Sequence, residues 1–105
     1  MSTTYAPGDP KNPCNQCSRE IYVSPQMGQE GSTYMDFRYG DCLKVLIFCQ
    51  PLKDGLHVDL LENGKSVELT ASTVNRTLTC TDDLEWMDTQ SQLIISNVTC
   101  LMRDG

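Results

Sequence analysis

Six cysteines in a chain of 105 residues constrain the fold more than any other feature of this sequence. The apolar fraction of 39% and the aromatic fraction of 7% allow only a modest core, so cross-links are expected to supply part of the stability. A high, even cysteine count is typical of secreted or cell-surface domains, because cytosolic thiols stay reduced. We therefore expect one extracellular domain whose cysteines form three disulfides: Cys14, Cys17, Cys42, Cys49, Cys80 and Cys100.

The C-x-x-C pair, Cys14 and Cys17, also raises two other interpretations. A zinc site needs a second ligand pair with similar local spacing, which is absent, and the sole histidine, His57, falls in a predicted strand. A redox pair needs a helix N-terminus, whereas a Pro- and Asn-rich segment precedes this motif and a strand is predicted after it. We favour structural disulfides, with the two cysteines bonded to different partners because close neighbours bond each other only under strain.

Short strands separated by turn residues dominate the pattern, and no segment has a helical period. Residues 1–13 contain three of the five prolines and predict a disordered tail or linker, followed by a domain over 14–102. About seven strands predict an antiparallel β-sandwich, immunoglobulin-like, with an open barrel as the alternative. The predicted strands span 18–24, 32–40, 42–49, a hairpin within 55–71, 73–80 and 91–102.

Three of these segments carry specific predictions. Asn63-Gly64 can adopt positive φ at both positions, as a type I′ turn requires, and predicts the hairpin. The segment 42–49 is the most apolar and is predicted to be a central strand, with one face formed by Leu43, Val45, Ile47 and Cys49. The first and last strands are expected to place on one face Ile21 with Val23, and Ile94 with Val98 and Cys100, respectively.

Side-chain direction divides the cysteines into two groups. Cys49, Cys80 and Cys100 each end a strand on its apolar face, so they are expected in the core, where two of them bridge the sheets as in immunoglobulin-like domains. Cys42 begins its strand on the opposite face and is expected to form a peripheral bond to Cys14 or Cys17.

The order of the motifs C-x2-C, GDCLKVLIFC, TLTC, Trp86 and IISNVTC resembles the C6 domain, a nematode extracellular module. The resemblance covers about residues 14–101. Some C6 domains lack the first and third cysteines together, which implies a Cys14–Cys42 bond here. For the other four cysteines we favour Cys49–Cys80 with Cys17–Cys100, while the two other pairings stay open. The family has no established activity.

Two sequons, Asn75-Arg76-Thr77 and Asn97-Val98-Thr99, are candidate glycosylation sites. Each asparagine is predicted to lie on the face opposite the core-facing cysteine of its own strand, where a glycan has room. We expect at least one of Asn75 and Asn97 to be modified in the native protein.

Trp86 lies within an acidic segment, DDLEWMD, and has two interpretations. We favour a core tryptophan packed over a disulfide. The alternative is an exposed anchor that contacts a basic partner together with Asp82, Asp83 and Glu85. The same carboxylates with Asp88 suggest calcium, but their spacing does not fit an EF-hand loop, so a solvated acidic turn without metal or cofactor is expected.

The net charge of −6, with eight scattered Lys and Arg residues, argues against nucleic acid and anionic membranes as partners. No apolar run approaches the roughly 20 residues of a membrane span, and no catalytic motif is present. These features predict a non-enzymatic extracellular module that binds an unidentified protein or glycan, through the loops 25–32 and 81–90, or spaces other domains. The alternatives are a secreted effector or inhibitor-like protein and a C-x-x-C thiol–disulfide oxidoreductase.

Overall fold

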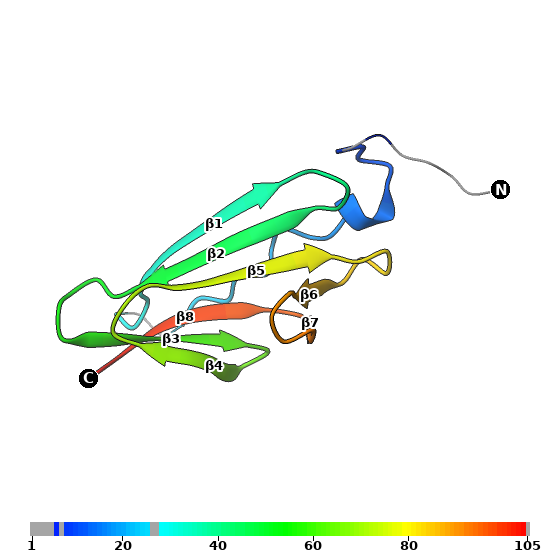
Figure 1. Cartoon of the computed structure of the whole chain (residues 1–105). Helices are drawn as coiled ribbons and strands as arrows, with labels where there is room; N and C mark the ends of the chain where they lie inside the picture. The colour runs from blue at the N-terminus through cyan, green and yellow to red at the C-terminus, as the bar shows by residue number, and fades with distance from the viewer. Residues whose placement is uncertain (1–5, 7, 26–27, 105) are drawn as a thin grey trace.

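The computed structural model describes residues 6, 8–25 and 28–104, and shows two antiparallel sheets packed as a β-sandwich (Figure 1). Residues 1–5 and 7 of the predicted tail, and residues 26 and 27 of the loop 25–32, lie outside the described residues. One sheet has the order β1-β2-β5-β6-β7 and the other has the order β4-β3-β8. The elements are the 3-10 helix η1 (Pro13–Asn15) and the strands β1 (Ser32–Arg38), β2 (Lys44–Gln50), β3 (Leu56–Glu62), β4 (Lys65–Thr70), β5 (Val74–Cys80), β6 (Trp86–Asp88), β7 (Ile94–Ile95) and β8 (Val98–Asp104). The predicted fold class is confirmed, with eight strands in place of about seven.

Strand β2 is central, as its apolar alternation predicted. It pairs with β1 on one side and β5 on the other, so that Ile47 lies opposite both Met35 and Arg76. Its inward face is fully buried and comprises Leu43, Val45, Ile47 and Cys49. Burial of these side chains against the second sheet is the main apolar contribution of this strand.

The β3–β4 hairpin is also confirmed. Asn63 and Gly64 have φ values of 56° and 79°, the left-handed conformations that the turn requires. A register shift between Leu60 and Leu61 interrupts the pairing of β3 with β4.

The predicted first strand, 18–24, is wrong. Tyr22 forms only an isolated parallel bridge to Val98, while Ile21 is buried and Val23 is half exposed. The segment lies against the edge of β8 that does not pair with β3, where Val23 N donates to Val98 O (2.9 Å) and Val98 N donates to Ile21 O (2.9 Å). Of the predicted pair Ile21 and Val23, Ile21 alone is buried in the core. The apolar alternation in this segment therefore did not indicate a paired strand.

The predicted last strand, 91–102, is divided between the two sheets. Ile94 and Ile95 form β7 beside β6, and the chain then crosses at Ser96 and Asn97 to enter β8 beside β3. At this crossing the buried positions change from odd-numbered to even-numbered residues. Ile95 is therefore buried, whereas Ile94, which was predicted to face the core with Val98 and Cys100, is exposed.

Part of the predicted tail belongs to the folded domain. Gly8 N donates to Gly40 O (2.7 Å), and the Asn15 side chain donates to Asp9 O (2.9 Å). The side chain of Asn12 accepts a hydrogen bond from Cys14 N, which caps η1. The described residues 8–13 therefore form turns that pack at the entrance of the domain, N-terminal to Cys14.

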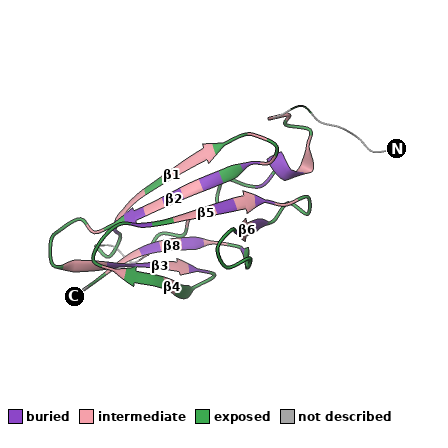
Figure 2. Ribbon diagram, in the orientation of Figure 1, coloured by how far each residue is buried: buried purple, intermediate pink, exposed green. Residues whose placement is uncertain are grey.

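A covalent bond joins the two sheets within the core. Cys49 on β2 is bonded to Cys100 on β8, with a Cα–Cα distance of 5.8 Å, and both side chains are fully buried. Figure 2 shows stretches of buried residues along β2, β5, β3 and β8, which contribute much of the core cluster. Two of the three cysteines predicted to face the core therefore bridge the sheets, as in immunoglobulin-like domains.

Candidate functional site

The cysteines of the C-x-x-C motif are bonded to different partners. Cys14 is bonded to Cys42 and Cys17 to Cys80, with Cα–Cα distances of 4.9 and 5.8 Å. Both motif cysteines are buried, and the structure contains no free cysteine. The pairing Cys14–Cys42, which the resemblance to C6 domains implied, is confirmed.

The favoured pairing of the remaining four cysteines, Cys49–Cys80 with Cys17–Cys100, is wrong. Cys49 lies opposite Val74 in the antiparallel β2–β5 pair, at the end of the pair remote from Cys80. Six residues of extended chain separate Val74 from Cys80, about 20 Å, which a disulfide cannot span. The two cysteines do share a face, as predicted, but the register places them at opposite ends of the sheet.

Trp86 belongs to the core, so the favoured interpretation of this residue is confirmed and its role as an exposed partner contact is not supported. It is 3% exposed and lies opposite Cys80, directly beside the Cys17–Cys80 bond. Its indole Nε1 donates to Ser18 O (2.8 Å), and its ring lies 6.1 Å from that of Phe37. Trp86 thus connects the N-terminal segment at Ser18 to β6, a strand that was predicted to be loop.

The acidic segment before β6 forms an exposed turn. Asp82, Asp83 and Glu85 are all exposed, and the turn closes through Thr81 N to Glu85 O (2.8 Å). Asp88, the fourth residue of the calcium hypothesis, is instead fully buried on β6. Among the described residues, no group of three or more His, Cys, Asp or Glu side chains is arranged to hold a metal ion.

The two sequons lie in different settings. Asn75 is exposed on β5, opposite Phe48, on the outward face of the five-stranded sheet. Asn97 is half-buried in the crossing between β7 and β8 rather than in a strand, and its carbonyl accepts a hydrogen bond from Asn63 N (3.0 Å). Asn75 is therefore the more accessible of the two glycosylation candidates.

A buried polar cluster, which the sequence analysis missed, spans the two sheets. Glu62 on β3 and Asp88 on β6 are 3% and 0% exposed, and Arg76 Nη1 on β5 lies 3.8 Å from Asp88 Oδ2. Asp88 Oδ1 accepts hydrogen bonds from the backbone N–H groups of Gln90 and Ser91. None of the donors in the described part of the chain reaches Glu62, so its one polar partner is the carboxyl group of Asp88.

This arrangement separates the protonation states of the two carboxyl groups. Burial, and then the hydrogen bond to Asp88 and its charge, raise the pKa of Glu62 to about 8. Burial alone would raise the pKa of Asp88, but the hydrogen bonds from Glu62, Gln90 and Ser91 and the charge of Arg76 hold it below its ordinary value. Glu62 therefore keeps its proton at neutral pH, while Asp88 beside it stays ionised.

Exposed apolar side chains gather beside β7. We use the term β7 patch for Leu84, Leu93 and Ile94, which are 52%, 60% and 43% exposed, together with Glu20 and Glu85. Ile94 stands between two hollows, one of about 200 Å³ that it shares with Leu84, Glu20 and Glu85, and one of about 260 Å³ that it shares with Leu93.

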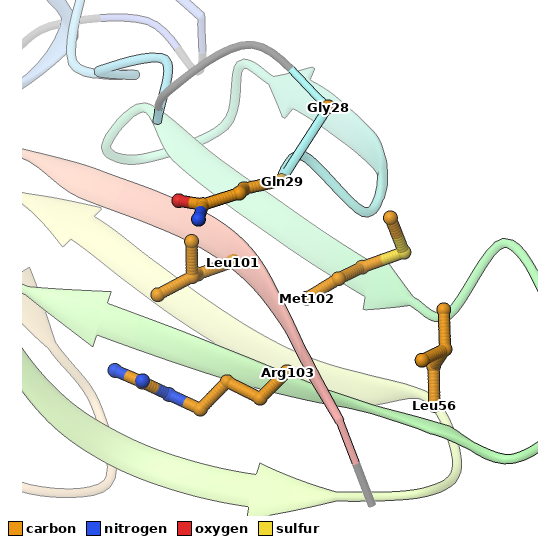
Figure 3. A pocket seen from close by; sticks show the side chains of 6 residues that line it. All are labelled: Gly28, Gln29, Leu56, Leu101, Met102 and Arg103. Carbon is orange, nitrogen blue, oxygen red and sulfur yellow. The ribbon is translucent and has the colours of Figure 1, made fainter.

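A third hollow, of about 360 Å³, lies beside β8 and includes part of the predicted contact loop 25–32 (Figure 3). Arg103 is the one charged residue among the described residues of its lining, and it donates to the buried Asp59 carboxylate (2.7 Å). The lining thus presents no free charge to a ligand. It comprises Gly28, Gln29, Leu56, Leu101, Met102 and Arg103.

Comparisons with known proteins do not assign the chain. No family model matches it, and no curated protein or solved structure is significantly similar to it. Across the described residues, no helix is long and apolar enough to cross a membrane.

Proposed function

We propose that this chain is an extracellular, non-enzymatic module whose disulfide-stabilised β-sandwich presents a surface for binding another protein. The observation that carries the proposal is the complete use of six cysteines in three separate bonds, one of which joins the sheets inside the core. Bonds of this kind persist in oxidising compartments. The resemblance to C6 domains, which are extracellular, supports the same compartment.

The state of the C-x-x-C motif supports a structural role over thiol–disulfide exchange. An oxidoreductase of this type alternates between two thiols and a bond within the motif, with an accessible attacking sulfur. Here Cys14 and Cys17 hold different parts of the domain and are 2% and 6% exposed. Breaking either bond would remove one of the two covalent links between the segment around residues 14–17 and the rest of the domain.

The surface supports binding of a protein over a small molecule. The described hollows are open and lie at sheet edges, whereas small-molecule sites are concave and bury most of their ligand. The β7 patch combines exposed apolar side chains with a charged rim, the composition that marks protein-binding surfaces. A glycan on Asn75 would lie on the outward face of β5.

Secretion from a eukaryotic cell line tests this proposal. We expect the secreted domain to contain no titratable thiol and to lose mass on treatment with peptide N-glycosidase, because the Asn75 sequon is exposed. A domain that folds equally well, with the same melting curve, while all six cysteines are reduced would contradict the proposal. Turnover of a disulfide substrate by the secreted protein would also contradict it.

A further inference from the structure

The β7 patch has features that specify the chemistry of a partner. Leu84 and Ile94 are apolar lining residues of the first hollow, and Glu20 and Glu85, both exposed, line the same hollow. The described residues include every Lys and Arg of the chain. None of the salt bridges among them involves Glu20 or Glu85. An apolar wall with free carboxylates at its rim matches the aliphatic stem and cationic end of a lysine or arginine.

The second hollow differs from the first. It shares Ile94 and Ile95 with the first hollow, but its other lining residues are Glu62, Asn63, Lys65, Val67 and Leu93. It has no exposed carboxylate, because the Glu62 carboxyl oxygens beneath it are shielded from solvent. This hollow therefore suits an apolar side chain, so the two hollows together favour a basic residue followed by an apolar one.

The backbone beside β7 is already occupied, which excludes simple strand addition. The Asn63 side chain donates to Ile94 O (2.9 Å) and accepts from Ser96 N (2.6 Å). A partner strand would have to displace both bonds to pair with this edge. Recognition here depends on side chains.

The turn that presents Leu84 is conformationally costly. Leu84 has a φ of 63°, a left-handed conformation that is unfavourable for leucine. Its N–H donates to Thr81 O (3.0 Å), and its side chain projects into solvent rather than into the core. The fold therefore maintains an unfavourable backbone conformation that keeps an apolar side chain at the rim of the first hollow.

We infer that the β7 patch binds an extended protein segment in which a lysine or arginine enters the hollow between Leu84 and Ile94 and a neighbouring apolar residue covers Leu93. The inference rests on the proposed function and names the class of partner. Its occupant is a basic, apolar peptide segment, which the charge of −6 of this chain also attracts over longer distances.

The test is a titration of the oxidised, unglycosylated domain with a capped peptide Leu-Lys-Leu-Lys-Leu, monitored by methyl and amide NMR signals. We expect the signals of Leu84 and Ile94 to move, and the matched peptide Leu-Glu-Leu-Glu-Leu to leave them unchanged. The double variant Glu20→Gln, Glu85→Gln should raise the Kd about fivefold, since each rim charge contributes a modest amount.

The matched control removes the same charge elsewhere. Asp41→Asn with Asp54→Asn alters two exposed loop carboxylates outside the β7 patch and should change the Kd less than about twofold. Equal weakening by both double variants, equal binding of both peptides, or unmoved Leu84 and Ile94 signals would each overturn the inference. Any of these results would leave the disulfide and secretion tests of the proposed function unaffected.

Discussion

The two sheets of the sandwich are joined at two places by opposite kinds of chemistry. Between β2 and β8, the connection is the apolar, covalent Cys49–Cys100 bond. Between β3 and β6, it is the pairing of the neutral Glu62 carboxyl group with the Asp88 carboxylate, with Arg76 beside it. The first connection depends on the redox state of the medium and the second on its pH.

The difference shows how this small domain tolerates polar groups in its interior. An uncompensated carboxylate between the sheets would be costly, so Glu62 is kept neutral while Asp88 retains its charge near Arg76. The disulfide has no such requirement, since it is fully buried among apolar side chains. We therefore expect the covalent connection to contribute more stability, and the polar connection to set how stability varies with pH.

Removing the covalent connection should have the largest effect. The Cys49→Ala, Cys100→Ala variant should lose about 4 kcal/mol of unfolding free energy, because the bond closes a loop with a sequence separation of 51. Urea denaturation measures the loss. The peripheral variant Cys14→Ala, Cys42→Ala is the control: its separation of 28 predicts a loss smaller by roughly 0.5 kcal/mol from loop length alone. A greater loss in the peripheral variant would reverse the ranking.

Raising the pH should weaken the polar connection. The folded pKa of Glu62, about 8, lies above the ordinary value of 4.5, so the protonated side chain favours the folded state. Its contribution is fully present below pH 4.5 and is lost as the pH rises through 8. The expected loss of unfolding free energy between pH 5 and pH 7 is about 2.5 kcal/mol. Asp88, with its lowered pKa, acts in the opposite direction and loses its contribution only as the pH falls through that lowered pKa.

Urea unfolding at several pH values checks this dependence. The variant Glu62→Gln should flatten the profile between pH 5 and pH 8, because the amide does not titrate. Glu68→Gln, which changes an exposed carboxylate on β4, should keep the slope of the unmodified chain. Identical slopes for the two variants would show that Glu62 does not control this region.

The packing around the covalent connection offers a smaller test. A Cβ added at Gly31 would lie 2.8 Å from Cys100 Sγ and 3.0 Å from Gln50 O, so Gly31→Ala should cost about 1–3 kcal/mol. Gly40→Ala is the matched control, since its nearest contact would be 4.0 Å away and its φ is not in the left-handed region. Thermal unfolding that shows equal stability for both variants would indicate that the chain around the disulfide adjusts freely.

The smallest expected effect concerns the turn at Leu84, which lies outside both the Cys49–Cys100 bond and the Glu62–Asp88 pair. Leu84→Asn should raise the unfolding free energy by about 0.5 kcal/mol, because asparagine tolerates the left-handed conformation better than leucine. The same variant should bind the basic peptide more weakly. Lower stability would mean that the exposed Leu84 side chain contributes packing that outweighs the backbone cost.

Sequence patterns predicted those parts of the fold in which alternation runs through a whole strand. The apolar face of β2 is of this kind, and the Asn63-Gly64 turn followed from its residue types. Prediction failed where the chain changes sheets within two residues, as it does between Ile95 and Val98. Such a crossing changes which alternate residues face the core, and the local sequence pattern does not indicate this change.

The candidate site was predicted less completely, for a related reason. The core-facing direction of Cys49 and Cys80 followed from their strands, but their partners depend on antiparallel register, which lies beyond single-strand patterns. Arg76 lies on β5 between the buried Val74 and Leu78. Its neighbours Glu62 and Asp88 come from two other strands, so only the folded sheets bring the three together.

Peptide mapping under non-reducing conditions tests the central claim, the covalent connection between the sheets. Trypsin together with cleavage after Glu85 places Cys49 in 45–53, Cys80 in 77–85 and Cys100 in 86–103. The structure predicts that 86–103 is linked to 45–53 alone, while 77–85 is linked to 12–19, which contains Cys14 and Cys17. A link between 45–53 and 77–85, or a bond between Cys14 and Cys17, would contradict the account.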